Sequence, residues 1–187
     1  NDFNTLTVTS TGDSVTLNDI NAVNLATLSA ADLTVTAAGN ISQSGNLNVT
    51  NNASFSAADV SLNQTNNFGA LALTANNATV TEAGDTELNG VNVTNLSLTS
   101  GGAITDSGAV VVTGTTSLTA ANGAALALDH TANNFSTVTI GSTGNEVTLA
   151  DVDGIDLGAM AVASLNLSTN GGITNSGALS ISGALTL

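Results

Sequence analysis

Apolar and small polar residues alternate along many short stretches of the chain. At 5–9, 33–36, 96–99, 137–140 and 165–168, leucine, valine or isoleucine occupies every second position between threonine, serine and asparagine. A period of two is typical of a β-strand that is buried on one face and exposed on the other. No useful length of chain has the helical period. The sequence therefore predicts an all-β fold of short strands, spaced about ten residues apart.

Three copies of a longer pattern run through the chain. Each copy opens with an Asn-Xaa-Phe element, and its phenylalanine recurs at nearly constant spacing (Phe3, Phe68 and Phe135). A second landmark recurs inside each copy, and its isoleucine has a similar spacing (Ile41, Ile104 and Ile173). In-register copies are typical of a repeat protein. We therefore expect one solenoid, residues 1–187, built of three blocks at 1–65, 66–132 and 133–187.

A block of this length is too long for one coil of a solenoid. It divides into about three coils of roughly 20–22 residues, each with two or three short strands. Stacked coils pair each strand with its equivalents above and below, which gives a parallel β-helix with an aliphatic interior. Equivalent positions of successive blocks, the three phenylalanines included, would then lie above one another. The competing fold is an antiparallel sandwich or barrel, which does not require in-register copies.

Composition narrows the possible functions. The chain has no Lys, Arg, Cys, Pro, Trp or Tyr, and its 14 acids give a formal charge of −14. Nucleic-acid binding depends on basic side chains, so it is excluded. Disulfides and thiol nucleophiles require cysteine, and they are excluded as well. No apolar run approaches the ~18–20 residues that a membrane span needs, so we expect no membrane insertion. Asparagines at repeated turn positions predict amide ladders between coils.

The motif Gly-Gly-Ala-Ile-Thr-Asp-Ser-Gly-Ala-Val-Val-Val-Thr at 101–113, its variants at 39–47 and 171–179, and the Asn-Asn-Phe openings resemble a known family. They are similar to the repeat region of filamentous haemagglutinin-type bacterial exoproteins, which are exported by two-partner secretion. They also resemble related autotransporter-like giant adhesins. The resemblance implies a right-handed parallel β-helix that forms a stalk or fibre outside the cell. No secretion module of that family is recognisable in the chain.

Few residues suggest specific chemistry. Asp151, Asp153 and Asp156 flank Gly154 and form a candidate calcium site, although they match neither an EF-hand nor the calcium-binding nonapeptide repeat. A looser acidic group has the same two interpretations, a cation site or a solvated turn (Glu82, Asp85 and Glu87). His130, the only histidine, follows Asp129, and neighbours on a strand point to opposite faces, so a surface role is expected.

Two other functions compete with a structural role. Thr-Xaa-Thr at 5–7, 7–9, 34–36, 79–81 and 137–139 would suit an ice- or surface-binding solenoid, but these copies do not recur in every predicted coil. A polysaccharide-processing β-helix is the third possibility. Lyases of that kind need basic residues that this chain lacks, and a hydrolase would need the aspartates at 151–156.

We therefore expect a structural stalk or fibre segment of an extracellular bacterial adhesin or surface filament, without catalysis. The expected location is outside the cell or on the bacterial surface. Neither end of the chain carries a polar cap, so we expect a window on a longer array or a subunit that stacks on copies of itself. Receptor contacts would lie in other regions. No cofactor is predicted beyond the calcium hypothesis.

Overall fold

The computed structural model describes residues 1–10 and 12–187, and these residues form strands and turns without a helix. None of them belongs to a helix that could cross a membrane. The all-β prediction is confirmed. The strands are β1 (Thr5–Thr9), β2 (Ser14–Asp19), β3 (Val23–Ala30), β4 (Asp32–Ala37), β5 (Ile41–Gln43), β6 (Leu47–Ser56), β7 (Asp59–Glu82), β8 (Thr86–Ser100), β9 (Ile104–Thr119), β10 (Leu126–Leu128), β11 (Asn134–Ile140), β12 (Glu146–Asp151), β13 (Ile155–Leu157), β14 (Met160–Val162), β15 (Ser164–Thr169), β16 (Ile173–Asn175), β17 (Leu179–Ile181) and β18 (Leu185–Thr186).

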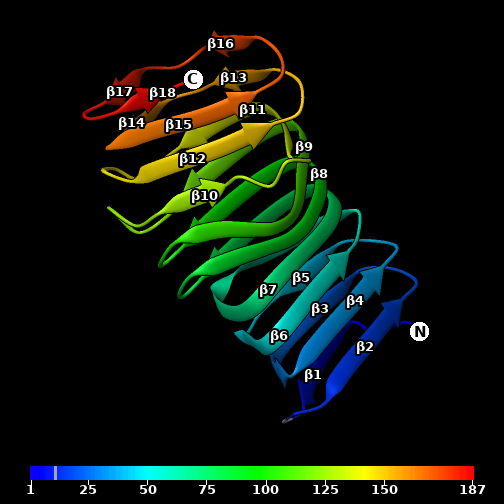
Figure 1. The fold of residues 1–187 in the computed structure, drawn as a ribbon. Coiled ribbons are helices and arrows are strands. Elements are labelled where there is room, and N and C mark those ends of the chain that lie inside the picture. The colour runs from blue at the N-terminus through cyan, green and yellow to red at the C-terminus, as the bar shows by residue number, and fades with distance from the viewer. Residues whose placement is uncertain (11) are drawn as a thin grey trace.

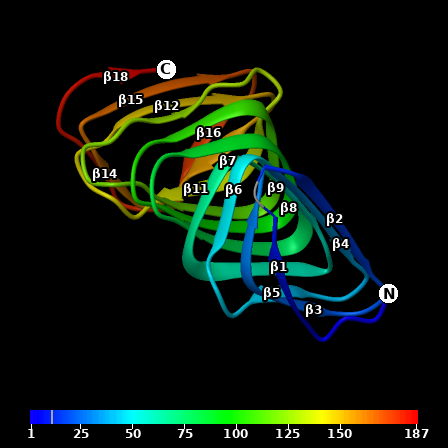
Figure 2. The ribbon, with the colours of Figure 1, turned by 90° about the horizontal axis from the view of Figure 1, so that it is seen from below.

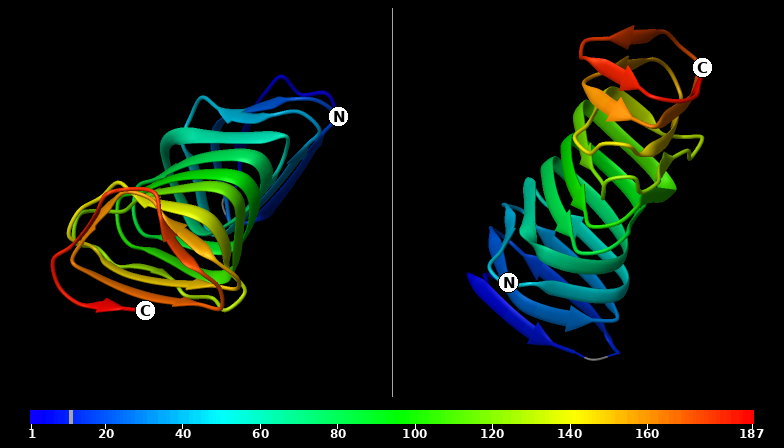
Figure 3. Two further views of the ribbon diagram at one scale, coloured as in Figure 1. Left: turned by 90° about the horizontal axis from the view of Figure 1, so that it is seen from above. Right: turned by 90° about the vertical axis from the view of Figure 1, so that its left-hand side faces the viewer.

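The strands stack as a parallel β-solenoid of about ten turns. Every strand pair is parallel, as in β2 with β4 and β12 with β15. The side views show the coils piled along one axis, with the two termini at opposite ends of the pile (Figure 1, Figure 3). Parallel pairing of this kind requires the chain to travel around a full coil before each new strand. The predicted β-solenoid is therefore confirmed.

Coil length varies along the solenoid. The number of residues between two paired positions in successive coils gives the coil length. It is smallest between Leu71 and Leu88 and largest between Val112 and Phe135. Coils of intermediate length are more common, as in the pair Ser14–Asp32. The predicted coil length thus lies in the upper part of the observed range, because most corners are tighter than the sequence suggested. β7, β8 and β9 pass around such corners without a break in the strand.

The interior is a continuous core of Leu, Val, Ile and Ala. Inward residues alternate with outward ones, as in β4, where Leu33 and Val35 are almost fully buried. Phe55 and Phe68 also lie inside, with their ring centroids 5.7 Å apart. Viewed along the axis, the coils enclose this core as a closed outline (Figure 2). The alternation therefore identifies the buried face of each strand.

Three vertical columns of residues follow the solenoid axis through the coils. The first contains Val23, Ile41 and Val60, followed by Ala78, Leu96, Thr116, Val138 and Leu157. The second contains Ala30, Val49 and Phe68 in the N-terminal coils, and a continuous run of Thr86, Ile104, Leu126, Val147 and Leu165 in the later coils. The third contains Asp19 and Ala37, followed by Ala57, Ala75, Val93, Val112 and Phe135.

The three block-opening phenylalanines do not share one column. Phe3 lies beside the first column, since the next residue, Asn4, accepts a hydrogen bond from the N–H of Asn24. Phe68 lies on the second column and Phe135 on the third. The prediction that equivalent positions of successive blocks lie above one another is therefore wrong. Ten turns over 187 residues average about 19 residues each, so a block of 65–67 residues makes about three and a half turns, and successive blocks begin about half a turn apart.

Thr116 is an inward threonine in the first column. Its side chain is completely buried, and its Oγ1 has no hydrogen-bond partner among the described residues. Valine has nearly the same shape and no polar atom to desolvate, so Thr116→Val should raise the free energy of unfolding by about 1 kcal/mol. Urea denaturation followed by circular dichroism would measure the change. Thr113→Val, at an exposed position of the same strand, is the control and should change stability little. A loss of stability in Thr116→Val would contradict the interpretation.

Candidate functional site

The three aspartates of the predicted calcium site do not act together. Asp151 ends β12 and is buried, and its Oδ2 accepts a hydrogen bond from the Phe135 N–H at 2.7 Å. Its Oδ1 accepts from the N–H of Asp153 at 3.0 Å. Asp153 is exposed, and its own Oδ1 accepts from the N–H of Gly154 at 2.6 Å. Two of the three carboxylates are thus occupied by backbone donors of the turn.

Asp156 lies on β13 and faces outward. Its carboxylate accepts hydrogen bonds from the hydroxyls of Ser176 and, at 3.0 Å, Thr174 in the next coil. These bonds, chiefly that from Ser176, hold the pKa of Asp156 below its usual value. Across residues 1–10 and 12–187, no three acidic or histidine side chains are grouped so that they could hold a metal ion. Calcium binding by Asp151, Asp153 and Asp156 stays a prediction.

The looser acidic group is also divided among separate roles. Glu82 is buried and points inward at the end of β7. Asp85 lies in the following turn, where its Oδ1 accepts from the N–H of Ala103 at 2.8 Å. Glu87 is exposed on β8. The three side chains therefore serve a core contact, a turn and the solvent-facing surface.

His130 lies in the loop between β10 and β11. Its Nδ1 accepts a hydrogen bond from the N–H of Ala132 at 3.2 Å, within the same loop. The backbone N–H groups of His130 and Asp129 both donate to the carboxylate of Asp106. Asp106 thus holds the backbone of this loop, and the imidazole closes a local turn. The contacts of His130 are therefore local to this loop.

The structure reveals a recurring contact that the sequence did not predict. At the start of each block, the backbone N–H of the phenylalanine donates to a carboxylate that arrives almost one coil later. The three pairs are Phe3 with Asp19 Oδ2 at 3.1 Å, Phe68 with Glu82 Oε2 at 3.3 Å and Phe135 with Asp151 Oδ2 at 2.7 Å. All three acids are buried. We call these residues the junction acids. At the start of each block, the acid's carboxylate accepts the phenylalanine N–H in place of a backbone carbonyl.

A buried asparagine strengthens the second and third junctions. The Oδ1 of Asn66 accepts from the N–H of Leu47 at 3.0 Å, and the Oδ1 of Asn133 accepts from the N–H of Val110 at 2.8 Å. Both asparagine side chains are fully buried. The Nδ2 of Asn133 also donates to Asp106 at 2.6 Å. These two block openings are therefore tied to neighbouring coils by polar side chains inside the solenoid.

Burial changes the acidity of two junction acids. It raises the pKa of Glu82 to about 7, despite the opposing hydrogen bond from the Phe68 N–H. Burial also raises the pKa of Asp151, and the N–H groups of Phe135 and Asp153 act in the opposite direction. The second oxygen of Glu82, Oε1, has no partner among the described residues. Glu82 is therefore a carboxyl group that titrates near neutral pH inside the core.

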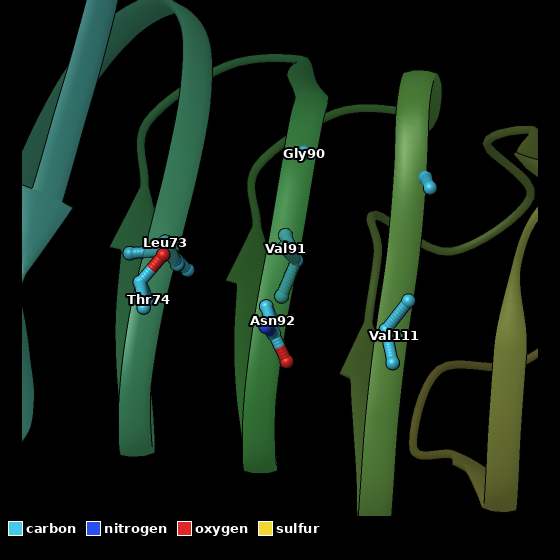
Figure 4. Close-up of a pocket in the computed structure, with 7 residues that line it drawn as sticks. Leu73, Thr74, Gly90, Val91, Asn92 and Val111 are labelled. Carbon is cyan, nitrogen blue, oxygen red and sulfur yellow. The ribbon is translucent and has the colours of Figure 1, made fainter.

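A shallow groove crosses the outside of β7, β8 and β9 (Figure 4). It has a volume of about 370 Å³, and its lining includes Leu73, Thr74, Val91, Asn92 and Val111. A second hollow of about 410 Å³ shares Thr74 and Asn92 with it. Neither lining contains a charged or aromatic side chain. The groove therefore supplies neither an acid–base pair nor a ring on which a sugar could stack.

A family model described as repeats of unknown function (DUF5649) matches the chain three times, at residues 11–74, 75–141 and 144–187. Each match begins at a nearly constant distance after one of the predicted block starts at 1, 66 and 133. Both divisions therefore follow the same repeat from different starting points. Searches of curated proteins and of solved structures find no match to the chain.

Proposed function

The chain belongs to the family of repeats of unknown function (DUF5649), and from that premise we propose that it is a rod segment of an extracellular bacterial fibre or adhesin. The observation that carries the proposal is the parallel ladder, which links successive coils from β1 and β2 to β16 and β18. With coils spaced about 4.8 Å apart, ten turns extend roughly 48 Å. Such a segment would act as a spacer between the parts of the fibre or adhesin at its two ends.

Side-chain ladders on the outside support a load-bearing role. Asn77 donates through Nδ2 to Asp59 at 2.8 Å, and Asn95 donates to the Oδ1 of Asn77 at 2.9 Å. The Oδ1 of Asn95 then accepts from the N–H of Thr115 at 2.9 Å. One bond of this series, from Asn95 to Asn77, joins two amides as expected of an amide ladder, and the series as a whole joins four successive coils at one corner. These bonds add to the backbone ladder rather than form a binding site.

The use of the acids also favours a structural role over catalysis. Each junction acid accepts a backbone N–H, and Asp85 and Asp106 hold turns in the same way. A carboxylate that holds the fold is poorly suited to transfer a proton to a substrate. The charge of −14 keeps such rods soluble and mutually repelling. Neighbouring repeats or further copies, stacked end to end, are the partners that the proposal implies.

The resemblance of 101–113 to filamentous haemagglutinin-type repeats supports a location outside the cell, and immunogold electron microscopy tests it. Antibodies against residues 1–187 would be applied to intact and to permeabilised cells of the source organism. We expect gold particles along projections of intact cells, with a cytoplasmic protein unlabelled as the control. Labelling that requires permeabilisation would contradict the proposal.

A further inference from the structure

Four successive coils present serine and threonine on the same outer face. The rungs lie on β7, β8, β9 and β11, at 79–81, 97–99, 115–119 and 137–139. We call the outward hydroxyl residues of these rungs the hydroxyl array. They are Thr79, Thr81, Ser97, Thr99, Thr115, Ser117, Thr119, Thr137 and Thr139. All nine are exposed or half-exposed, and the residues between them are buried.

The strand register places these hydroxyls in vertical lines. Thr79 pairs with Ser97, and Ser97 pairs with Ser117. Ser117 pairs in turn with Thr139, which makes the line continuous over four coils. A second line runs through Thr81, Thr99 and Thr119, and a third joins Thr115 to Thr137. No register shift interrupts the paired rungs. The array is therefore two-dimensional.

The sequence predicts a broken ladder, because Thr-Xaa-Thr is missing from several coils. The structure shows that Ser97-Xaa-Thr99 and Ser117-Xaa-Thr119 fill the coils between 79–81 and 137–139. Serine supplies the same hydroxyl as threonine at these positions, so the ladder continues through the two middle rungs.

The array has the geometry of a rigid lattice. Backbone pairing sets the hydroxyls about 4.7–4.9 Å apart along the axis and about 6.6 Å apart along each strand. All members except Ser97 and Ser117 are threonine, whose branched side chain has few χ1 rotamers. Little side-chain freedom is therefore lost when the array binds a periodic surface.

The chemistry of the array limits what it can bind. None of the 14 acids lies at 79–81, 97–99, 115–119 or 137–139. The acids begin at the edges, with Asp156, which pairs with Thr137, and Asp59, which bonds to Asn77. Divalent cations prefer carboxylates, and tight protein contacts usually centre on aromatic or arginine side chains. With these two kinds of partner disfavoured, the array suits a neutral, periodic surface rich in hydrogen-bonding groups. The hydroxyls can both donate hydrogen bonds to such a surface and accept them from it.

We propose that the hydroxyl array binds the surface of an ice crystal, whose ordered water molecules form such a periodic partner. This function goes beyond the rod proposed above and does not depend on it. The groove of Figure 4 lies apart from the array, because it is lined by Thr74, Asn92 and Val111.

Ice-affinity partitioning of the chain 1–187 tests the proposal. The wild-type protein should be incorporated into a slowly growing ice hemisphere and should inhibit ice recrystallisation. Ser97→Lys and Ser117→Lys place a charge within the array, so incorporation should fall at least about tenfold. Asn92→Lys and Val111→Lys are the controls, because these residues pair on the same two strands, β8 and β9, but line the groove on a different face. The control variants should behave like the wild type.

Circular dichroism and melting curves would establish that all variants fold alike before the ice measurements. Exclusion of the wild-type protein from ice, to the same extent as an inert soluble protein, would overturn the proposal. Equal losses in the array and control variants would also overturn it. Binding to crystalline cellulose or chitin, with none to ice, would show that the array fits a different periodic surface and would reject ice as the partner.

Discussion

Phe135→Ala should lower the free energy of unfolding by about 3–5 kcal/mol, the usual cost of removing a fully buried phenylalanine from a core. Phe135 has no exposed surface and lies directly over Val112 in the third column. The coils on either side are joined to it by many strand bonds, so they cannot close around the cavity. Urea denaturation followed by circular dichroism would measure the loss.

Phe3→Ala is the matched control for Phe135→Ala. Phe3 opens the first block in the same way, but it is only half-buried and packs at the edge of the core. We expect Phe3→Ala to lower the free energy of unfolding by about 1 kcal/mol, because the Phe3 side chain buries less apolar area. Equal losses from the two substitutions would mean that the two positions have equal surroundings, contrary to the full burial of Phe135 and the half-buried place of Phe3.

The free energy of unfolding should fall by about 3 kcal/mol as the pH rises from about 4.5 to about 7. Burial raises the pKa of Glu82 from 4.5 to about 7 in the folded protein. Between these values the folded state keeps the proton and the unfolded state releases it, so folding is favoured at the lower pH. Above pH 7 both states are ionised, and the contribution of Glu82 no longer changes.

Glu82→Gln isolates this contribution, because glutamine imitates the protonated acid and does not titrate. Denaturation curves at several pH values should show a much weaker pH dependence in the variant, with a stability near that of the wild type at low pH. A smaller decrease of the same sign should persist, since burial also raises the pKa of Asp151. The interpretation fails if wild type and Glu82→Gln lose stability in parallel as the pH rises.

The alternation of residues predicted the strands and the buried positions well, because one face of each strand must avoid water. The apolar positions of the predicted strands at 33–36, 96–99, 137–140 and 165–168 are buried as the pattern requires, whereas Leu6 and Val8 in the first coil are half-buried. The relation between block and coil could not be predicted in the same way. Coil length depends on how many residues each corner uses, and corners made of Asn, Gly, Ser and Ala give similar sequences for different lengths. The assumption of a whole number of coils therefore misplaced the phenylalanines.

The contacts between the junction acids and the block-opening phenylalanines were not predicted from the sequence. Asp19, Glu82 and Asp151 each follow a block-opening phenylalanine at a similar spacing, so a regular signal was present. Asp151 was instead grouped with its near neighbours Asp153 and Asp156 as a candidate ligand. Closeness along the chain favoured that grouping, whereas the contact with Phe135 depends on a return of the chain almost one coil later. Only a known coil length could have distinguished the two interpretations.

The advance of about half a turn per block gives an array of such blocks an approximate twofold screw axis. Each block rises roughly 17 Å, so corresponding surface features alternate between opposite sides of the rod and return to the same side after two blocks. A partner that recognises one block surface would then meet copies of it facing two opposite directions. Lateral binding would be multivalent on both of these sides of the rod.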